Sequence, residues 1–281
     1  MHLLRLRRVA TVATAMVALG MGVAGDAPAT LRGARSNVQM PTQWSECMDA
    51  EQRRNVHQHA AQYAFVFTRG AYSAWRGFGR RGGSWATDWP KSDCQFNVVF
   101  RRLTNLHAYP AEHAITLDDP NLRRFPFLYM LEVGRMGLSP EEVKGLRDYA
   151  IAGGFVMIDD FWGSQEWANF EDQMRVVFPE YPIEEIPLDH ALFNSFYKID
   201  EVLQVPNINN GCGGWGTSER DGYVPHVLGI FNERRRLMVV INWNTDLGDA
   251  WEWAEQACYP VKYSHYAFQV GVNTIIYAMS H

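Results

Sequence analysis

The sequence is short of basic residues and of the motifs that mark several common enzyme classes. Its 26 Lys and Arg side chains are outnumbered by 31 Asp and Glu, which leaves a formal net charge of −5. Nucleic-acid-binding domains usually carry a basic face, so this balance argues against a nucleic-acid partner. The chain lacks G-x-S-x-G and H-E-x-x-H, and its glycine-rich stretch 211–216 lacks the Gly-Lys-Ser/Thr ending of a phosphate-binding loop.

Cysteine is also scarce, with four residues at Cys47, Cys94, Cys212 and Cys258. No pair has the C-x-x-C spacing of a zinc ribbon or a thioredoxin-type site. In an oxidising compartment four cysteines allow three disulfide pairings, and the spacing does not choose among them or exclude free thiols. Cys212 lies in a stretch that approaches G-x-C-x-G, but Asn210 takes the first glycine position and no strand-to-helix turn is indicated. We therefore do not favour a nucleophilic Cys212.

What the chain does have is an N-terminal export pattern. Residues 1–8 are basic, and Val9–Ala24 is an uncharged apolar run whose end, Val23-Ala24-Gly25, offers small residues at the positions that a signal peptidase reads. This is the layout of a secretory signal peptide. The run of 16 residues falls below the roughly 20 needed to span a bilayer, so cleavage is favoured over a membrane anchor. We predict an exported protein, periplasmic or extracellular, that contacts a membrane only through an uncleaved signal segment.

The rest of the chain, 47% hydrophobic overall, reads as globular. We divide it into a signal peptide (1–25), a linker with an N-terminal helical segment (26–60) and an α/β domain (61–281). Apolar spacing predicts strands at 63–67, 125–131, 155–158 and 237–241, and helices at 93–106, 140–152, 166–177 and 264–279. Residues 204–225 are expected to form a loop.

The clearest unit is strand–helix–strand in the middle of the chain. Ser139-Pro140-Glu141-Glu142 has the pattern of a capping box with proline at the first helical position, and Gly153-Gly154 predicts the helix end. Two buried strands joined by a helix imply a right-handed crossover and a parallel sheet. The expected fold is one α/β domain with helices on both faces of the sheet.

Acidic residues follow the predicted strands. Glu132 comes directly after one strand and Asp159-Asp160 after the next, and ligands of open α/β sheets bind at these carboxyl ends. The acids could act as general bases, hydroxyl acceptors or ligands of a hard cation. In the structural alternative, one Asp caps the next helix, the other accepts loop N–H bonds, and Glu132 pairs with Arg135. His190 could assist as a base or simply bond a backbone carbonyl.

Other polar and aromatic residues receive weaker interpretations. Asp246 and Asp249 follow the predicted strand that ends at Ile241, and they also flank the start of an expected helix, where acids favour the helix dipole. His57-Gln58-His59 is a weak metal signal in a polar segment. Six tryptophans near expected loops could stack on sugar rings or peptide, or cover the core: Trp85, Trp89, Trp162, Trp243, Trp251 and Trp253.

An ordered set of short motifs resembles the bacterial family catalogued as domain of unknown function 4159 (DUF4159), over roughly residues 61–281. The motifs are Trp85-Ala-Thr-Asp-Trp-Pro90, Phe100-Arg-Arg-Leu-Thr104, Leu117-Asp-Asp-Pro120, Phe125-Pro-Phe-Leu-Tyr-Met130, Leu138-Ser-Pro-Glu-Glu142, Gly153-Gly-Phe155, Asp159-Asp-Phe161, Phe178-Pro179, Asp189-His190, Asp246-Leu-Gly-Asp-Ala-Trp-Glu252 and Gly271-Val-Asn-Thr274.

The resemblance implies a class I glutamine amidotransferase-like fold, a three-layer α/β/α sandwich with a mainly parallel, flavodoxin-like sheet. In amidotransferases a Cys occupies the elbow after a central strand. The matching elbow here is Glu132-Val133-Gly134, which has neither Cys nor Ser, so the resemblance does not carry glutaminase activity to this chain. Larger relatives are membrane-anchored and accompany envelope proteins.

Two functions follow as hypotheses, with no cofactor assigned. The preferred one is an exported non-catalytic domain that binds a carbohydrate, a peptide or an envelope protein at the strand-end cleft. The alternative is a hydrolase in which Asp159, Asp160 or Glu132 activates water and His190 assists. A third, weaker option is a calcium site built from the same acids.

Overall fold

The computed structural model describes residues 50–74 and 84–281, with no side-chain description for 50 and 51. The predicted signal peptide, the linker up to residue 49 and Cys47 lie outside the described residues. The strands are β1 (Thr68–Ala71), β2 (His113–Thr116), β3 (Phe127–Leu131), β4 (Phe155–Asp159), β5 (Ile183–Glu185), β6 (His226–Phe231) and β7 (Leu237–Trp243). The helices are α1 (Ala50–Arg54), α2 (Val56–His59), α3 (Lys91–Leu103), α4 (Pro140–Ile151), α5 (Gly163–Val177), α6 (Ile208–Gly213), α7 (Leu247–Glu252) and α8 (Val261–Ser280).

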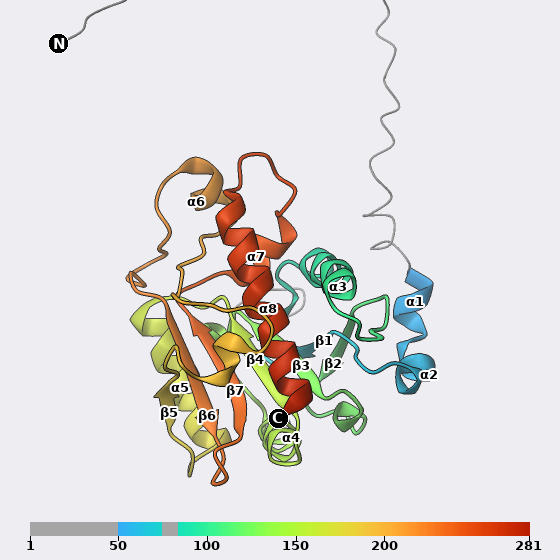
Figure 1. The fold of residues 1–281 in the computed structure, drawn as a ribbon. Helices are drawn as coiled ribbons and strands as arrows, with labels where there is room; N and C mark the ends of the chain where they lie inside the picture. Colours follow the sequence, from blue (N-terminus) through green and yellow to red (C-terminus); the bar gives the residue numbers. More distant parts are fainter. Residues whose placement is uncertain (1–49, 75–83) are drawn as a thin grey trace, which may run out of the picture. The chain divides into compact units, whose positions relative to one another are not determined.

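All seven strands form one mixed sheet in the order β2-β1-β3-β4-β7-β6-β5 (Figure 1). The neighbours from β2 to β7 pair in parallel, and β6 pairs antiparallel with both β7 and β5. The expected α/β class with a mainly parallel sheet is therefore confirmed. Because β1, β3, β4 and β7 run the same way, their carboxyl ends meet at one edge of the sheet.

Two buried clusters lie on the opposite sides of these strands, because alternate side chains of a strand point to opposite faces. One cluster joins Phe127 and Tyr129 of β3 to Trp251 of α7 and to residues of α3 and α8. The other joins Leu128 of β3 to Phe170 of α5 and to residues of α4. In Figure 1, α8 is the long red helix that crosses the sheet. No helix in the described part of the chain is long and apolar enough to cross a membrane.

The capping signals of the central unit act as the sequence predicts. The Ser139 hydroxyl accepts from the Glu142 N–H (3.2 Å), and the Glu142 carboxylate accepts from the Ser139 N–H (2.8 Å). Helix α4 ends at Ile151, and Gly153 follows with φ +117°, a conformation that favours glycine. Strands β3 and β4 pair in parallel from Phe127 and Phe155 onward, as the strand–helix–strand pattern implied.

Two predictions of local structure were wrong. The first strand begins at Thr68, after the predicted segment 63–67, of which Phe65 forms only an isolated bridge with Ala108. The expected loop 204–225 contains α6, which begins where the Asn207 side chain accepts from the Asn210 N–H (2.8 Å). Strands β2, β5 and β6 were not predicted. Strands β2 and β5 have only four and three residues, too few for a periodic pattern.

Candidate functional site

A polar pocket of about 230 Å³ lies at the carboxyl ends of β3, β4 and β7. It is lined by seven carboxylates and only two guanidinium groups. The lining residues are Thr87, Asp88, Glu132, Arg135, Asp160, Trp162, Glu166, Asn207, Asn209, Glu219, Arg220, Asp246 and Asp249. Larger hollows of about 510, 410 and 360 Å³ occur elsewhere on the described surface. This smaller pocket is the candidate site because it lies where ligands of open α/β sheets bind and because four of its seven acids are buried.

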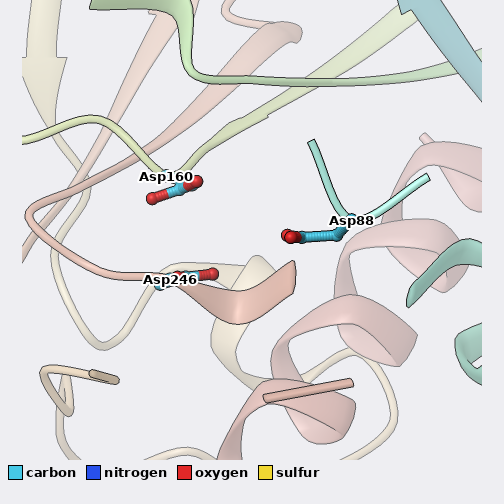
Figure 2. A group of neighbouring side chains, drawn as sticks. All are labelled: Asp88, Asp160 and Asp246. Carbon is cyan, nitrogen blue, oxygen red and sulfur yellow. The ribbon is translucent and has the colours of Figure 1, made fainter. Parts of the chain in front are cut away.

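At its centre three aspartates face one another (Figure 2). Asp88, Asp160 and Asp246 each offer one carboxylate oxygen, and these three oxygens lie within 4.8 Å of one another. Asp160 and Asp246 are buried, and Asp88 is half-buried. A second group of three, Asp88, Asp249 and Glu252, meets the same distance limit and shares Asp88. We call Asp88, Asp160 and Asp246 the aspartate triad.

Each member of the aspartate triad comes from a different element. Asp160 directly follows β4, and one of its oxygens accepts from the Trp162 indole N–H (3.0 Å). Asp246 is the N-cap of α7, where its Oδ1 accepts from the Asp249 N–H (2.8 Å). Asp88 comes from the segment before α3, and its buried Oδ2 has no hydrogen-bond partner. The triad thus contains one carboxylate oxygen that the protein itself leaves unsatisfied.

Arg69 of β1 fixes the segment that carries Asp88. Its side chain is fully buried and donates to the carbonyls of Trp85 (2.9 Å) and Thr87, on the N-terminal side of Asp88. It also forms a buried ion pair with Asp93 on the other side. A guanidinium suits this task because it presents several donors in one rigid plane. Arg69 therefore positions Asp88 without lining the pocket.

Burial and mutual repulsion raise the pKa values of the triad. The pKa of Asp160 lies well above 3.8, first because of burial and then because of the charges of Glu132 and Asp88. The pKa of Asp246 is raised by burial and by Asp160, and that of Asp88 by burial and by Asp249. Within the described residues, none of the three forms an ion pair. These carboxylates are thus poised to hold a proton or a cation.

The backbone around the pocket is held in an uncommon conformation. Six non-glycine residues of the described part have positive φ, and four of them line the pocket. The four are Asp88 (60°), Glu132 (54°), Asp160 (49°) and Arg220 (51°). Each such residue costs on the order of 1–3 kcal/mol, and such costs cluster at ligand sites. The strain falls where the carboxylates must turn into the pocket.

The adjacent pair Asp159-Asp160 divides between two roles. The buried Asp159 accepts from the Tyr129 hydroxyl (2.7 Å) and from the N–H groups of Leu247 and Gly248 (3.0 Å each), at the start of α7. It joins β3, β4 and α7 and does not line the pocket. Burial raises its pKa to about 7, although these hydrogen bonds oppose the increase. Asp160 alone of the two faces the pocket.

Glu132 lines the pocket as the strand-end pattern predicted. It follows β3 in a left-handed conformation, and the Glu132–Arg135 pair is loose at 3.8 Å. Arg135 also lies 3.5 Å from Glu166, to which Arg220 is closer at 2.8 Å. The pKa of Glu132 is raised mainly by burial. Both pocket arginines thus lie within 4.0 Å of carboxylates that are not members of the triad.

His190 is not brought to the other predicted residues. Its Nδ1 accepts from the Leu192 N–H (3.2 Å), and its ring packs against Phe231 and against Tyr277 near the end of α8. It is absent from the pocket lining. The structure therefore assembles Asp160 and Glu132 in one pocket, with Asp159 beneath it and His190 apart.

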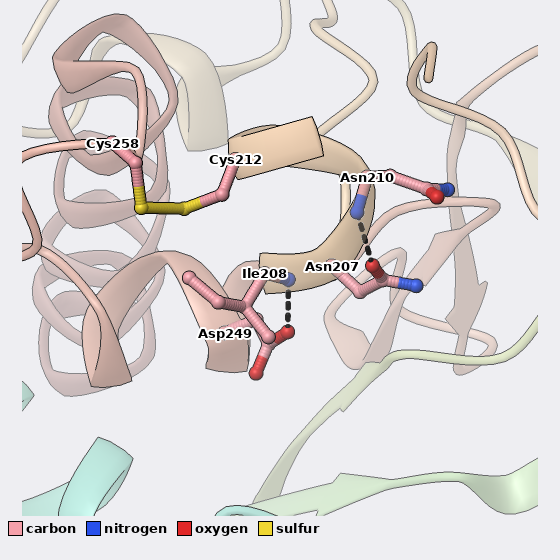
Figure 3. Close-up of a disulfide and its surroundings, with 6 residues drawn as sticks. All are labelled: Asn207, Ile208, Asn210, Cys212, Asp249 and Cys258. Carbon is pink, nitrogen blue, oxygen red and sulfur yellow. Dashed lines mark hydrogen bonds between the residues drawn. A yellow bond between two sulfur atoms is a disulfide. The ribbon is translucent and has the colours of Figure 1, made fainter. Parts of the chain in front are cut away.

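Cys212 is disulfide-bonded to Cys258 (Figure 3). The bridge ties the end of α6 to the segment between α7 and α8, and Asp249 of α7 accepts from the first N–H of α6, that of Ile208. A disulfide sulfur is not a free nucleophile, in agreement with the interpretation of Cys212. Of the two histidines in the weak metal signal His57-Gln58-His59, His57 packs on His113 and Phe125 and does not line the pocket.

Sequence reasoning missed Asp88, and it preferred a helix-dipole role for Asp246, although this residue follows the predicted strand that ends at Ile241. Asp246 does cap α7, yet it also lines the pocket. Asp88 belongs to the Trp-Ala-Thr-Asp-Trp-Pro motif. It could have been found from its position on the long connection that follows the carboxyl end of β1, where ligands of such sheets bind. Trp215, which is 77% exposed beside the pocket-lining segment, was also not singled out.

The oxygen-only donor set suits a hard divalent cation. Calcium takes carboxylate oxygens at about 2.3–2.6 Å, so two of its ligands lie no more than about 5 Å apart. The triad oxygens meet that limit before any rearrangement. The pocket lining offers neither imidazole nor thiolate, the ligands that zinc prefers. Chemically, the site can hold calcium or magnesium, or it can accept hydrogen bonds from hydroxyl and ammonium groups.

A family described as "Domain of unknown function (DUF4159)" matches residues 71–279, which include every pocket residue. No curated protein matches the chain. Since the match covers well over half of the sequence, this chain belongs to the DUF4159 family.

Proposed function

We propose that this protein is an exported, non-catalytic binding domain whose strand-end pocket holds a hard divalent cation of the calcium type. The observation that carries the proposal is the aspartate triad, in which three carboxylates converge and none forms an ion pair among the described residues. Leaving such charges buried and unpaired is costly. A bound cation removes that cost and offers open coordination positions to ligand oxygens.

Export is supported by two features. The N-terminal basic and apolar segments have the layout of a signal peptide. The Cys212–Cys258 disulfide fits an oxidising compartment, such as the periplasm or the cell exterior. In that setting the ligand would be a carbohydrate, a peptide or an envelope protein.

The finer fold is proposed to be a flavodoxin-like three-layer sandwich of the glutamine amidotransferase-like class. In support, the parallel strands have buried clusters on both sides. The residue after β3 adopts the left-handed conformation of an elbow, and that residue is Glu132. An elbow that carries a carboxylate in place of Cys or Ser supports binding over acyl transfer.

A hydrolase remains the second candidate, favoured by one observation. Glu132 and Asp160 share the pocket. After burial, the charge of Glu132 is the largest cause of the raised pKa of Asp160, and the charge of Asp160 in turn raises the pKa of Asp246. A carboxyl group with a raised pKa can act as a general acid or base. This mechanism would run without His190. Turnover of ester or glycoside substrates that disappears in Glu132→Gln would favour it over the binding domain.

Isothermal titration calorimetry with calcium chloride tests the binding proposal. The wild-type chain should bind calcium, and Asp88→Asn, Asp160→Asn and Asp246→Asn should each weaken binding at least about tenfold, because each removes one charged ligand. Asp200→Asn is the matched control, since Asp200 is an exposed acid paired with Lys198. Equal calcium affinity in the triad variants and the control would refute the proposal.

A further inference from the structure

The most exposed large hydrophobic side chains of the described residues belong to one segment beside the pocket. Trp215 is 77% exposed and Tyr223 is 72% exposed, ahead of Val261 at 62%, and Val224 beside Tyr223 is 57% exposed. Other exposed hydrophobics are scattered singly over the surface, which is ordinary for a soluble protein. A tryptophan that loses so little of its surface on folding contributes little to the core. Its exposure therefore calls for another explanation.

The backbone that presents Trp215 is firmly braced. The Cys212–Cys258 disulfide holds the end of α6, three residues before it. The Trp215 N–H donates to the Asn210 carbonyl (3.3 Å), and the Asn210 side chain donates to the Ser218 carbonyl (3.2 Å). Braced loops lose less conformational entropy when a ligand binds. The segment thus holds an exposed indole in a preset position.

The same segment supplies one wall of the pocket. Asn207, Asn209, Glu219 and Arg220 all line it, on either side of Trp215 in sequence. The indole rests against Gly213, where an added Cβ would lie 2.9 Å from the ring. Helix α6 has six residues and spans about 9 Å. The indole and the pocket therefore lie within reach of one short oligosaccharide.

We propose that Trp215 is a stacking platform for a neutral oligosaccharide whose hydroxyls enter the aspartate pocket. The apolar C–H face of a sugar ring packs on an aromatic ring, while its hydroxyls donate to carboxylates and ligate a hard cation. The seven pocket carboxylates repel phosphate-bearing ligands. The inference rests on the proposed function for the pocket and adds the class of ligand.

Calorimetric titration of the full chain with cellohexaose, maltohexaose and chitin hexasaccharide, in calcium chloride, tests the platform. At least one should bind, and Trp215→Ala should weaken it about tenfold while Trp215→Tyr restores most of the affinity. Phe196→Ala is the matched control, because Phe196 is an exposed aromatic that is absent from the pocket lining. Calcium affinity and melting temperature should be unchanged in Trp215→Ala.

The outcomes separate the two proposals. Binding of none of the three oligosaccharides, binding unaffected by Trp215→Ala, or binding of poly-L-lysine in their place would overturn the platform, even if calcium binds. Oligosaccharide binding that depends on Trp215 and persists unchanged in EDTA would sustain the platform and count against the cation site.

Discussion

Calcium chloride is expected to raise the melting temperature of this protein by roughly 5–10 °C near neutral or mildly alkaline pH. A ligand at about 100 times its Kd stabilises the folded state by about 2.7 kcal/mol, and each kcal/mol shifts the midpoint by about 2–4 °C in a domain of this size. Differential scanning calorimetry in calcium and in EDTA measures the shift. The Asp160→Asn variant should show little of it, because one triad ligand is neutralised.

The shift should shrink as the pH falls toward the ordinary aspartate pKa of 3.8. The pKa values of Asp88, Asp160 and Asp246 are raised in the folded state, so folding takes up protons there. Without a cation, these acids therefore contribute stability below that pH, and the contribution is lost as the pH rises through their folded pKa values. For Asp159, that window runs from 3.8 to about 7.

Calcium must displace the same protons. It therefore binds best at a pH at which the triad acids of the cation-free protein have lost their protons and no longer contribute this stability. The gap between the calcium and EDTA melting curves should thus widen with pH. Exposed acids with salt-bridge partners change stability in both buffers alike and cancel from the gap. A gap that is constant across pH, or equally large in Asp160→Asn, would contradict the assignment of the triad as the cation site.

Replacing the two adjacent aspartates should have opposite effects on stability in EDTA. Asp159→Asn should lower the free energy of unfolding by about 1–3 kcal/mol or more, because an amide nitrogen would face backbone donors that the carboxylate now accepts from. Asp160→Asn should be neutral or stabilising by about 1 kcal/mol, because it relieves repulsion with Glu132 and Asp88.

Urea denaturation at neutral pH measures the free energy of unfolding of both variants, in which the Asp and Asn side chains have nearly the same volume. Each variant is a control for the other, since the substitution is the same and the positions are neighbours in sequence. Tyr129→Phe should reproduce part of the Asp159→Asn loss, because the Tyr129 hydroxyl is a donor to Asp159. Equal losses in Asp159→Asn and Asp160→Asn would show that both acids are structural, which removes the triad from any binding role.

Much of the fold follows from local sequence signals in the centre of the chain. The capping box at Ser139 and the apolar runs of β3 and β4 are strong because each is complete within a few residues. The edge strand β5, which pairs antiparallel with β6, has only three residues, all at least partly exposed, and carries little pattern. Helix α6 has six residues and depends on the Asn207 cap and the disulfide more than on periodicity.

The site was predictable only where the sheet itself delivers the residue. Asp160 and Glu132 directly follow parallel strands, so their shared edge could be inferred. Asp88 reaches the same edge because Arg69 binds two carbonyls of its segment, a long-range contact that no local pattern reveals. The division between Asp159 and Asp160 depends on the hydroxyl of Tyr129 and the start of α7, which lie far from them in sequence.

Terbium luminescence tests the central claim most directly. Terbium replaces calcium at oxygen sites, and its emission is sensitised by an indole close to the bound ion. Trp162 meets that requirement, because its indole N–H lies 3.0 Å from the Asp160 carboxylate. We expect sensitised emission in the wild-type chain, displacement by calcium, and loss of the signal in Asp160→Asn and Asp246→Asn. Absence of emission in the wild type, or emission unchanged in both variants, would contradict a cation site at the aspartate triad.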